Sequence, residues 1–235
     1  MVKKGYRMQH LAIIPDGNRR WAAQHKLESL LGHRKGVEVF RTAMKFCLDK
    51  GIKFLSVYTF SLENFRRSEG EKSYLFSMIA EVFVKELPEL IKNQVCVRFV
   101  GDRARFPVDM REVIERIETT TKDFTGLTVS LLFCYGSRGE VTATVKDLAQ
   151  RVKDGTLTVD AITDQLIQDS LWTGNIPDPD LVIRTGGAMR TSNFMLLQTA
   201  YSEWMFVDEF WPELTEAHFA QCVEKFNTVK RNFGS

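Results

Sequence analysis

Short apolar runs alternate with amphipathic stretches along the chain, and this alternation restricts the possible folds more than any other feature. The predicted strands are residues 11–14, 52–60, 95–100, 127–134, 181–183 and 204–207. Strands separated by helices of ten or more residues indicate parallel βαβ units with right-handed crossovers. The sequence therefore predicts an α/β fold with a single central, mostly parallel six-stranded sheet flanked by helices.

The predicted helices begin near residue 18 and cover about 37–50, 73–91, 107–117, 140–152, 159–172, 192–199 and 215–226. The stretch 73–91 is apolar around most of its circumference, whereas a helix on a protein surface needs only an apolar stripe. It is expected either to be buried as core or to line an apolar space, and periodicity does not separate these alternatives. Pro88 should kink or end it.

Composition narrows the classes of protein. The chain has 235 residues, 44% hydrophobic and 26% charged, which fits one domain over residues 1–235. A net charge of +2 is too small for nucleic-acid binding. No run approaches the roughly 18 apolar residues of a membrane span, and the run after Lys3, Lys4 and Arg7 is too short for a signal peptide. We expect a cytoplasmic protein with four reduced, packed thiols, at Cys47, Cys96, Cys134 and Cys222.

A polar cluster follows each of the first five predicted strands. The clusters are Asp16 to Arg20, Ser61 to Arg67, Gly101 to Arg103, Tyr135 to Gly139 and Arg184 to Gly187. In a parallel sheet, ligands bind outside the carboxyl ends of the strands. We therefore expect these clusters to gather at one edge, although ordinary surface loops are the simpler alternative.

Two of the clusters have the composition of phosphate sites. At the first, a helix start and the arginines Arg19 and Arg20 can receive a phosphate, and Asp16 can hold a Mg²⁺ that bridges to it. The alternative there is a turn with Asp16 as helix cap. The second cradle comprises Arg184, Arg190 and Ser192. Nucleotide-binding glycine motifs are absent. Two cradles and an apolar helix indicate two phosphorylated ligands, at least one with a long apolar tail.

The same residues resemble a known family. The blocks are Asp16-Gly17-Asn18-Arg19-Arg20-Trp21-Ala22, Gly32-His33-x-x-Gly36, Thr59-Phe60-Ser61-x-Glu63-Asn64, Arg184-Thr185-Gly186-Gly187-x-x-Arg190-x-Ser192-Asn193-Phe194 and Tyr201-Ser202-Glu203. They are similar, in this order, to the signature blocks of the cis-prenyltransferases, above all to the bacterial members that make undecaprenyl diphosphate. The likeness covers residues from about 9 to 214. The D-D-x-x-D pairs of trans-prenyl synthases are absent.

The resemblance implies an enzyme that joins isopentenyl diphosphate to an allylic diphosphate, usually farnesyl diphosphate, whose tail occupies an apolar tunnel. It implies Asp16 and Asn64 as catalytic residues, and Mg²⁺ bound by Asp16 and Glu203. Asn64 would position the reacting groups, because an amide is a very weak base. The implied substrate-binding residues are Gly17, Asn18, Arg19, Arg20, Trp21, His33, Ser61, Leu62, Glu63, Phe65, Arg67, Arg184, Arg190, Thr191 and Ser192. The resemblance also implies a homodimer, and the apolar product implies peripheral contact with the inner face of the plasma membrane.

The chain departs from the family pattern at four positions. These are Ser29, where a basic residue is common, Phe65, Ala188 and Met189. The role of His33 could instead be capping or packing, and Glu203 could be a solvated charge at a strand end. The alternatives to a long-chain synthase are a cis-prenyltransferase with a shorter product, a non-catalytic partner subunit and an unrelated phosphate-binding α/β protein. Retention of Asp16, Arg20, Arg184 and Arg190 argues against a partner subunit.

Overall fold

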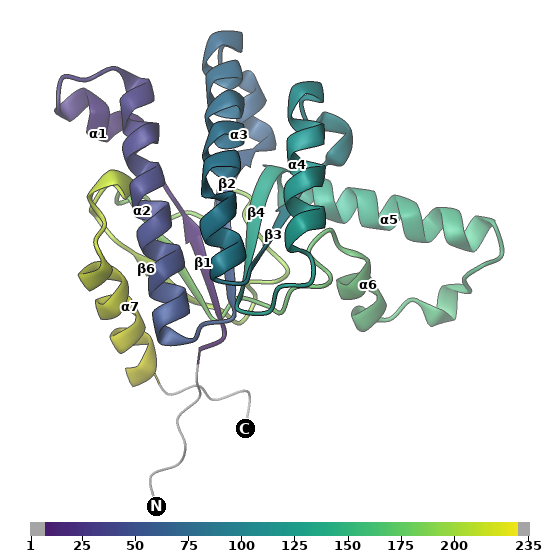
Figure 1. The fold of residues 1–235 in the computed structure, drawn as a ribbon. Coiled ribbons are helices and arrows are strands. Elements are labelled where there is room, and N and C mark those ends of the chain that lie inside the picture. The colour runs from purple at the N-terminus through teal and green to yellow at the C-terminus, as the bar shows by residue number, and fades with distance from the viewer. Residues whose placement is uncertain (1–7, 230–235) are drawn as a thin grey trace, which may run out of the picture.

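The computed structural model describes residues 8–229, and the strands in this range form one sheet (Figure 1). They are β1 His10–Ile14, β2 Phe54–Ser61, β3 Val95–Val100, β4 Leu127–Tyr135, β5 Leu181–Arg184 and β6 Glu203–Phe206. Their order is β3-β4-β2-β1-β5-β6, and every neighbouring pair is parallel. The predicted six-stranded sheet is confirmed. The single domain over 1–235 stays a prediction, because residues 1–7, with Lys3, Lys4 and Arg7, and 230–235 lie outside the described range.

The helices cover the two faces of the sheet unequally. They are α1 Asn18–Gln24, α2 Ser29–Lys50, α3 Glu69–Lys92, α4 Val108–Thr121, α5 Ser137–Lys153, α6 Asp164–Ser170 and α7 Glu216–Thr228. One face packs against α2, α3, α4 and α7, and in Figure 1 the side-by-side helices α2 and α3 extend past the carboxyl ends of the strands. The other face is covered largely by the irregular segments 172–176 and 194–195. Within residues 8–229, no helix combines the length and apolar character needed to cross a membrane.

Strand residues alternate between these two cores. Leu11 and Ile13 of β1 enter the core under the helices, whereas Ala12 and Ile14 enter the smaller core on the opposite face. A strand buried on both faces is continuously apolar, which explains the uninterrupted composition of these runs. The four cysteines are free and buried, as predicted, at Cys47, Cys96, Cys134 and Cys222.

Three helix predictions need correction. Of the two effects predicted for Pro88, an end of the helix is wrong, because α3 continues to Lys92 with the proline on its exposed side, and a kink stays a prediction. The predicted helix 159–172 is divided into the short 3₁₀ turn η3 Val159–Ala161 and α6, because Thr163 caps a new helix by accepting a hydrogen bond from the backbone N–H of Leu166 at 3.2 Å.

The predicted helix 192–199 is wrong, because this segment forms successive turns. Ser192 and Asn193 have φ values of 50° and 63°, in the left-handed region, which a right-handed helix does not allow. The backbone carbonyl of Asn193 accepts a hydrogen bond from the N–H of Ser137 at 2.8 Å, and the N–H of Leu196 donates to the Ser137 hydroxyl at 3.0 Å. The start of α5 therefore determines the shape of this loop.

Candidate active site

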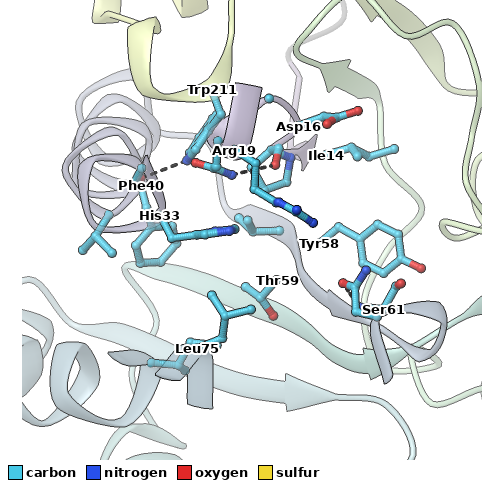
Figure 2. Close-up of a pocket in the computed structure, with 18 of the residues that line it drawn as sticks. Ile14, Asp16, Arg19, His33, Phe40, Tyr58, Thr59, Ser61, Leu75 and Trp211 are labelled. Atoms are coloured by element: carbon cyan, nitrogen blue, oxygen red, sulfur yellow. Dashed lines mark hydrogen bonds between the residues drawn. The ribbon is translucent and has the colours of Figure 1, made fainter. Parts of the chain in front are cut away.

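A cavity of about 1110 Å³ opens at the carboxyl ends of β1, β2 and β5, between α1, α2 and α3 (Figure 2). The polar clusters after the first, second and fifth strands all contribute to its lining, as the sheet topology predicts. The clusters after β3 and β4 do not line it. Arg103 of the third cluster instead forms an ion pair with Glu118 of α4 at 2.7 Å.

Asp16 is at the centre of the polar end of this cavity. It follows β1, and its Oδ2 accepts a hydrogen bond from Nη2 of Arg184 at 2.9 Å, while Oδ1 lies 3.2 Å from Nη2 of Arg20. Partial burial tends to raise the pKa of the Asp16 carboxyl, but Arg184 and Arg20 outweigh it and lower this pKa below its usual value. The carboxylate is therefore ionised at neutral pH.

Arg184 connects Asp16 to the second predicted cradle. Its side chain is only 3% exposed, and Nη1 donates to the Ser192 hydroxyl at 2.7 Å and to the backbone carbonyl of Arg190. Its Nε is buried and has no hydrogen-bond partner among the described residues. Because a guanidinium presents donors in a fixed fork, this contact set determines where the positive charge is placed. Arg190 itself is exposed and does not line the cavity.

The first cradle depends on Gly17, whose backbone conformation and close surroundings both disfavour a side chain. Gly17 has a φ of 103°, and a Cβ at this position would lie 2.6 Å from Cδ1 of Phe210. This turn ends β1 and begins α1 at Asn18 without a side-chain cap. Arg19 and Arg20 both line the cavity, and in Figure 2 the Arg19 side chain extends into it.

The walls formed by α1 and α2 carry polar atoms without partners among the described residues. Nε2 of His33, the hydroxyl of Ser29 and Oδ1 of Asn18 are buried and have no hydrogen-bond partner among the described residues. Burial, and to a lesser extent Arg67, lowers the pKa of His33 to about 4, so the ring is neutral at pH 7. Buried polar atoms of this kind are normally satisfied by water or a ligand. The departure at Ser29 therefore replaces a basic group with a neutral one that still faces the cavity.

The 3₁₀ turn η1, Leu62–Arg66, forms the next part of the wall. Oδ1 of Asn64 accepts a hydrogen bond from the backbone N–H of Ser61 at 3.0 Å, so part of this amide already holds the turn. Arg67 forms an ion pair with Glu71 of α3 at 3.0 Å. Ser61, Glu63, Asn64 and Arg67 line the cavity.

The opposite end of the cavity is apolar. It lies between α2 and α3, and Phe40 and Leu75 mark this end in Figure 2. The apolar lining residues of these helices and of the sheet include Val37, Phe40, Val57, Leu75, Met78, Ile79, Val82, Phe83 and Leu131. The wide apolar surface of α3 was expected either to be buried as core or to line an apolar space, and it does both. Leu75 and Phe83 are buried, and these two residues also line the cavity.

Several candidate residues lie outside the cavity. Leu62, Trp21, Phe65, Arg190 and Thr191 do not line it. The Trp21 ring lies 4.4 Å from that of His25 on α1, and the Phe65 ring packs on Phe60 at 5.2 Å.

The fold does not place Glu203 next to Asp16. It begins β6, in register with Leu181 of β5 and through it with Leu11 of β1, whereas Asp16 lies beyond the other end of β1. The strand from Leu11 to Ile14 alone separates the two positions by about 10 Å. Within one chain the register therefore keeps the two carboxylates apart, and a Mg²⁺ site formed by Asp16 and Glu203 stays a prediction.

The chemistry of the remaining residues fits Mg²⁺ with a single protein ligand. Among residues 8–229, no group of three or more His, Cys, Asp or Glu side chains could hold a metal. Mg²⁺ commonly binds through one or two carboxylates together with substrate phosphates and water. The ionised Asp16, beside guanidinium groups that would hold a diphosphate, has the composition of such a site.

Two residues that the sequence analysis did not assign to the site, Thr185 and Asn193, contact residues that it did assign. The Thr185 hydroxyl accepts a hydrogen bond from the backbone N–H of Asp16 at 2.8 Å and donates to its carbonyl at 2.6 Å. Asn193 lines the cavity and contacts Glu63. Both residues lie inside the sequence block from Arg184 to Phe194 that resembles the family. Their position in this block could have identified them as site residues.

Comparison with known proteins agrees with this geometry. A family model described as "Putative undecaprenyl diphosphate synthase" matches residues 14–234. The isoprenyl transferase of Agrobacterium fabrum is 43% identical over 227 residues, which cover 97% of this chain and 92% of that protein. A protein of Micrococcus luteus named ditrans,polycis-undecaprenyl-diphosphate synthase ((2E,6E)-farnesyl-diphosphate specific) is 38% identical, over 96% of this chain and 91% of its own.

Solved structures share the fold. The crystal structure of lavandulyl diphosphate synthase from Lavandula x intermedia, in complex with dimethylallyl diphosphate, superposes with a TM-score of 0.94 at 29% identity, covering 97% of this chain and 99% of that chain. A probable undecaprenyl diphosphate synthase from Campylobacter jejuni superposes with a TM-score of 0.81 at 30% identity, covering 98% and 100%. The chain belongs to the cis-prenyltransferase family of isoprenyl transferases.

Proposed function

We propose that this enzyme transfers isopentenyl units from isopentenyl diphosphate onto an allylic diphosphate with cis geometry and makes a long polyprenyl diphosphate. The observation that carries the proposal is one continuous cavity with two unlike ends. Four guanidinium groups and two carboxylates line its polar end, from Arg19, Arg20, Arg67, Arg184, Asp16 and Glu63. Such an excess of positive charge suits two diphosphates, and the apolar end between α2 and α3 suits a growing prenyl chain.

The proposed primer is farnesyl diphosphate and the proposed product is undecaprenyl diphosphate, for the lipid carrier of cell-wall synthesis. The name of the Micrococcus luteus relative supports both. A shorter product is the second candidate, supported by the close superposition on lavandulyl diphosphate synthase. Product length depends on the depth of the apolar end of the cavity. A long polyprenyl product requires a deeper apolar end than a short product does.

In the proposed reaction, the allylic diphosphate is bound at Gly17 to Arg20 and the isopentenyl diphosphate at Arg184, Arg190 and Ser192. Breaking the allylic C–O bond transfers negative charge to the departing diphosphate, and guanidinium groups held in advance stabilise that charge. The ionised Asp16 would hold a Mg²⁺, which when bound neutralises diphosphate charge and polarises the oxygen of the leaving group. The buried and neutral His33 adds no charge to this end.

The isopentenyl double bond then attacks the allylic carbon, and a proton is lost from the adduct. Asn64 is proposed to position the reacting groups, because its amide oxygen already accepts a hydrogen bond from Ser61 and an amide is a very weak base. A diphosphate oxygen or a water molecule is the proposed acceptor of the proton.

We also propose a homodimer and peripheral contact with the inner face of the plasma membrane from a cytoplasmic location. The edge strand β6 supports the dimer, because the rings of Trp204 and Phe206 stack at 5.7 Å and exposed apolar side chains lie in the preceding segment, at Leu196, Leu197 and Tyr201. Sedimentation equilibrium tests the dimer.

The proposed membrane contact is tested with lipid vesicles. We expect the protein to bind the vesicles only when its substrates are supplied. A turnover rate that does not change when lipid is added would contradict this proposal.

The test of the proposed activity is incubation of labelled isopentenyl diphosphate with farnesyl diphosphate and Mg²⁺, with products sized by chromatography. We expect a ladder of cis-polyprenyl products that disappears with a chelator and in Asp16→Ala. Its longest product distinguishes the two candidate lengths. Binding of both diphosphates without incorporation would indicate a non-catalytic partner subunit, and absence of binding would contradict the proposal as a whole.

A further inference from the structure

Asn193 hydrogen-bonds to two other segments, the start of α5 and the turn η1, and it uses both ends of its amide to do so. Oδ1 accepts a hydrogen bond from the backbone N–H of Arg138 at 2.9 Å, and Nδ2 donates to Oε1 of Glu63 at 3.0 Å. These partners fix the orientation of the amide, because only its oxygen suits an N–H group and only its nitrogen suits a carboxylate. Asn193 thereby ties the loop after β5 both to α5 and to η1.

The backbone of Asn193 is as constrained as its side chain. Its φ of 63° is left-handed, a conformation that asparagine tolerates better than most residues. The preceding residue, Ser192, shares this conformation and accepts the hydrogen bond from Arg184. A change in the path of the chain at Asn193 therefore moves the serine on which the buried Arg184 is positioned.

The Asn193 side chain also affects the charge and position of Glu63, to which it donates a hydrogen bond. Partial burial tends to raise the pKa of this carboxyl, but the hydrogen bond from Asn193 and other contacts lower it below its usual value. Glu63 directly precedes Asn64 in η1. The contact between Asn193 and Glu63 thus sets the separation between the Arg184–Ser192 cradle and the turn that carries Asn64.

We propose that Asn193 is a positioning residue that holds the isopentenyl cradle in register with η1 and so aligns the two substrates. This inference rests on the proposed function of the same cavity. Joining two bound substrates requires their reacting atoms to be held within a narrow range, and a displacement of about 1 Å can cost about a hundredfold in rate. Asn193 acts through Ser192, Arg184 and Glu63.

Two substitutions separate the side chain from the backbone. Asn193→Gly keeps the left-handed conformation available but removes both side-chain hydrogen bonds, and we expect kcat to fall about tenfold and the Kd for isopentenyl diphosphate to rise about tenfold. Asn193→Asp keeps the acceptor for Arg138 but places a carboxylate against Glu63, and we expect a larger loss. Adding Glu63→Gln supplies a donor to the new aspartate, so the double variant should be more active than Asn193→Asp alone.

The matched control is Asn93→Asp. Asn93 at the end of α3 also donates to a glutamate, with Nδ2 3.3 Å from Oε2 of Glu89, and it does not line the cavity. It should leave kcat and the Kd unchanged. Loss of stability alone would lower Tm but leave kcat and the Kd of the folded protein unchanged well below Tm, so these two readouts separate positioning from a purely structural role.

The Kd is measured by titration calorimetry, which does not require turnover. Unchanged kcat and Kd in Asn193→Gly, or a double variant no more active than Asn193→Asp, would overturn the proposal. If the wild-type protein does not turn over but Asn193→Gly still weakens isopentenyl diphosphate binding, the positioning role stands and the proposed activity fails. If the wild-type protein does not bind isopentenyl diphosphate, both fail.

Discussion

The polar end of the cavity is held together by directional bonds, whereas the apolar end is held by packing. At the polar end, Asp16, Arg184 and Ser192 are linked by hydrogen bonds of 2.7–2.9 Å. At the other end, side chains from α2 and α3 meet through ring and aliphatic contacts, such as the edge-to-face pair of Phe40 and Phe83 at 6.0 Å.

This difference has a functional consequence. A directional network loses its geometry when one atom is misplaced, so the polar end should tolerate few substitutions. Packing tolerates changes of size more gradually, so the apolar end can change in depth without loss of the chemistry. We therefore expect substitutions at the polar end to change the rate and substitutions at the apolar end to change the length of the product.

The largest effect is expected from Arg184→Lys. Lysine keeps the positive charge but cannot bind Asp16 and Ser192 through one planar fork, so the turnover rate should fall about a thousandfold, or about 4 kcal/mol. The measurement is kcat for isopentenyl incorporation. The control is Arg151→Lys, on the surface of α5 and paired with Asp147 at 3.7 Å, which should have no effect. Near-normal turnover in Arg184→Lys would show that charge alone suffices at the polar end.

The second prediction concerns the close contact between α1 and α2. Gly32 of α2 packs against α1, and a Cβ at this position would lie 2.1 Å from the backbone oxygen of Asn18. Because that atom belongs to the backbone, Gly32→Ala must separate the two helices, and we expect about 3 kcal/mol less stability in urea unfolding.

The matched control for this substitution is Gly70→Ala in α3. A Cβ at Gly70 meets no atom within 4 Å, so alanine should stabilise the helix by about 0.5–1 kcal/mol. If Gly32→Ala proved as stable as Gly70→Ala, the close approach of α1 to α2 would not exist in solution.

A smaller effect is expected at the boundary between the two ends, where His33 lies. Its pKa is about 4 in the folded protein and about 6.5 when unfolded, so the unfolded chain binds the proton more readily. The stability contributed by the neutral ring is complete above pH 6.5 and is lost as the pH falls towards 4, by about 2 kcal/mol between pH 7 and pH 5.

The variant His33→Gln tests this effect, since it removes the titrating group. Its stability should fall less steeply between pH 7 and pH 5 than that of the wild-type protein. His10, whose pKa is likewise lowered to about 4 by burial, contributes the same loss to both proteins. Identical pH profiles would show that His33 titrates normally.

The sequence predicted what depends on local pattern. Apolar runs gave all six strands, and the rule that ligands bind at the carboxyl ends of parallel strands brought the Asp16, Ser61 and Arg184 clusters to one cavity. The strands were predictable because a strand buried on both faces has a continuously apolar composition. The gathering of the clusters was predictable because each cluster directly follows a strand in the sequence, and parallel strands end at the same edge of the sheet.

Features that depend on distant partners were not predicted. The segment 192–199 has the composition of a helix, but α5 fixes it in left-handed turns through Ser137 and Arg138. Glu203 belongs to a signature block, yet the register of β6 places it at the opposite end of the sheet from Asp16. In both cases tertiary contacts decide the outcome, and one sequence does not specify such pairings.

The most direct measurement compares Val82→Trp with Val84→Trp, two substitutions on the same helix. Val82 lines the apolar end, whereas Val84 is exposed and does not. The first-addition rate and the product length are measured together with labelled isopentenyl diphosphate. We predict that Val82→Trp shortens the longest product while the first-addition rate stays within about twofold of wild type, and that Val84→Trp changes neither. An unchanged product length in Val82→Trp would contradict the account, and so would a first-addition rate that falls together with the length. Either result would show that the polar end does not determine the rate, and the apolar end the product length, independently of each other.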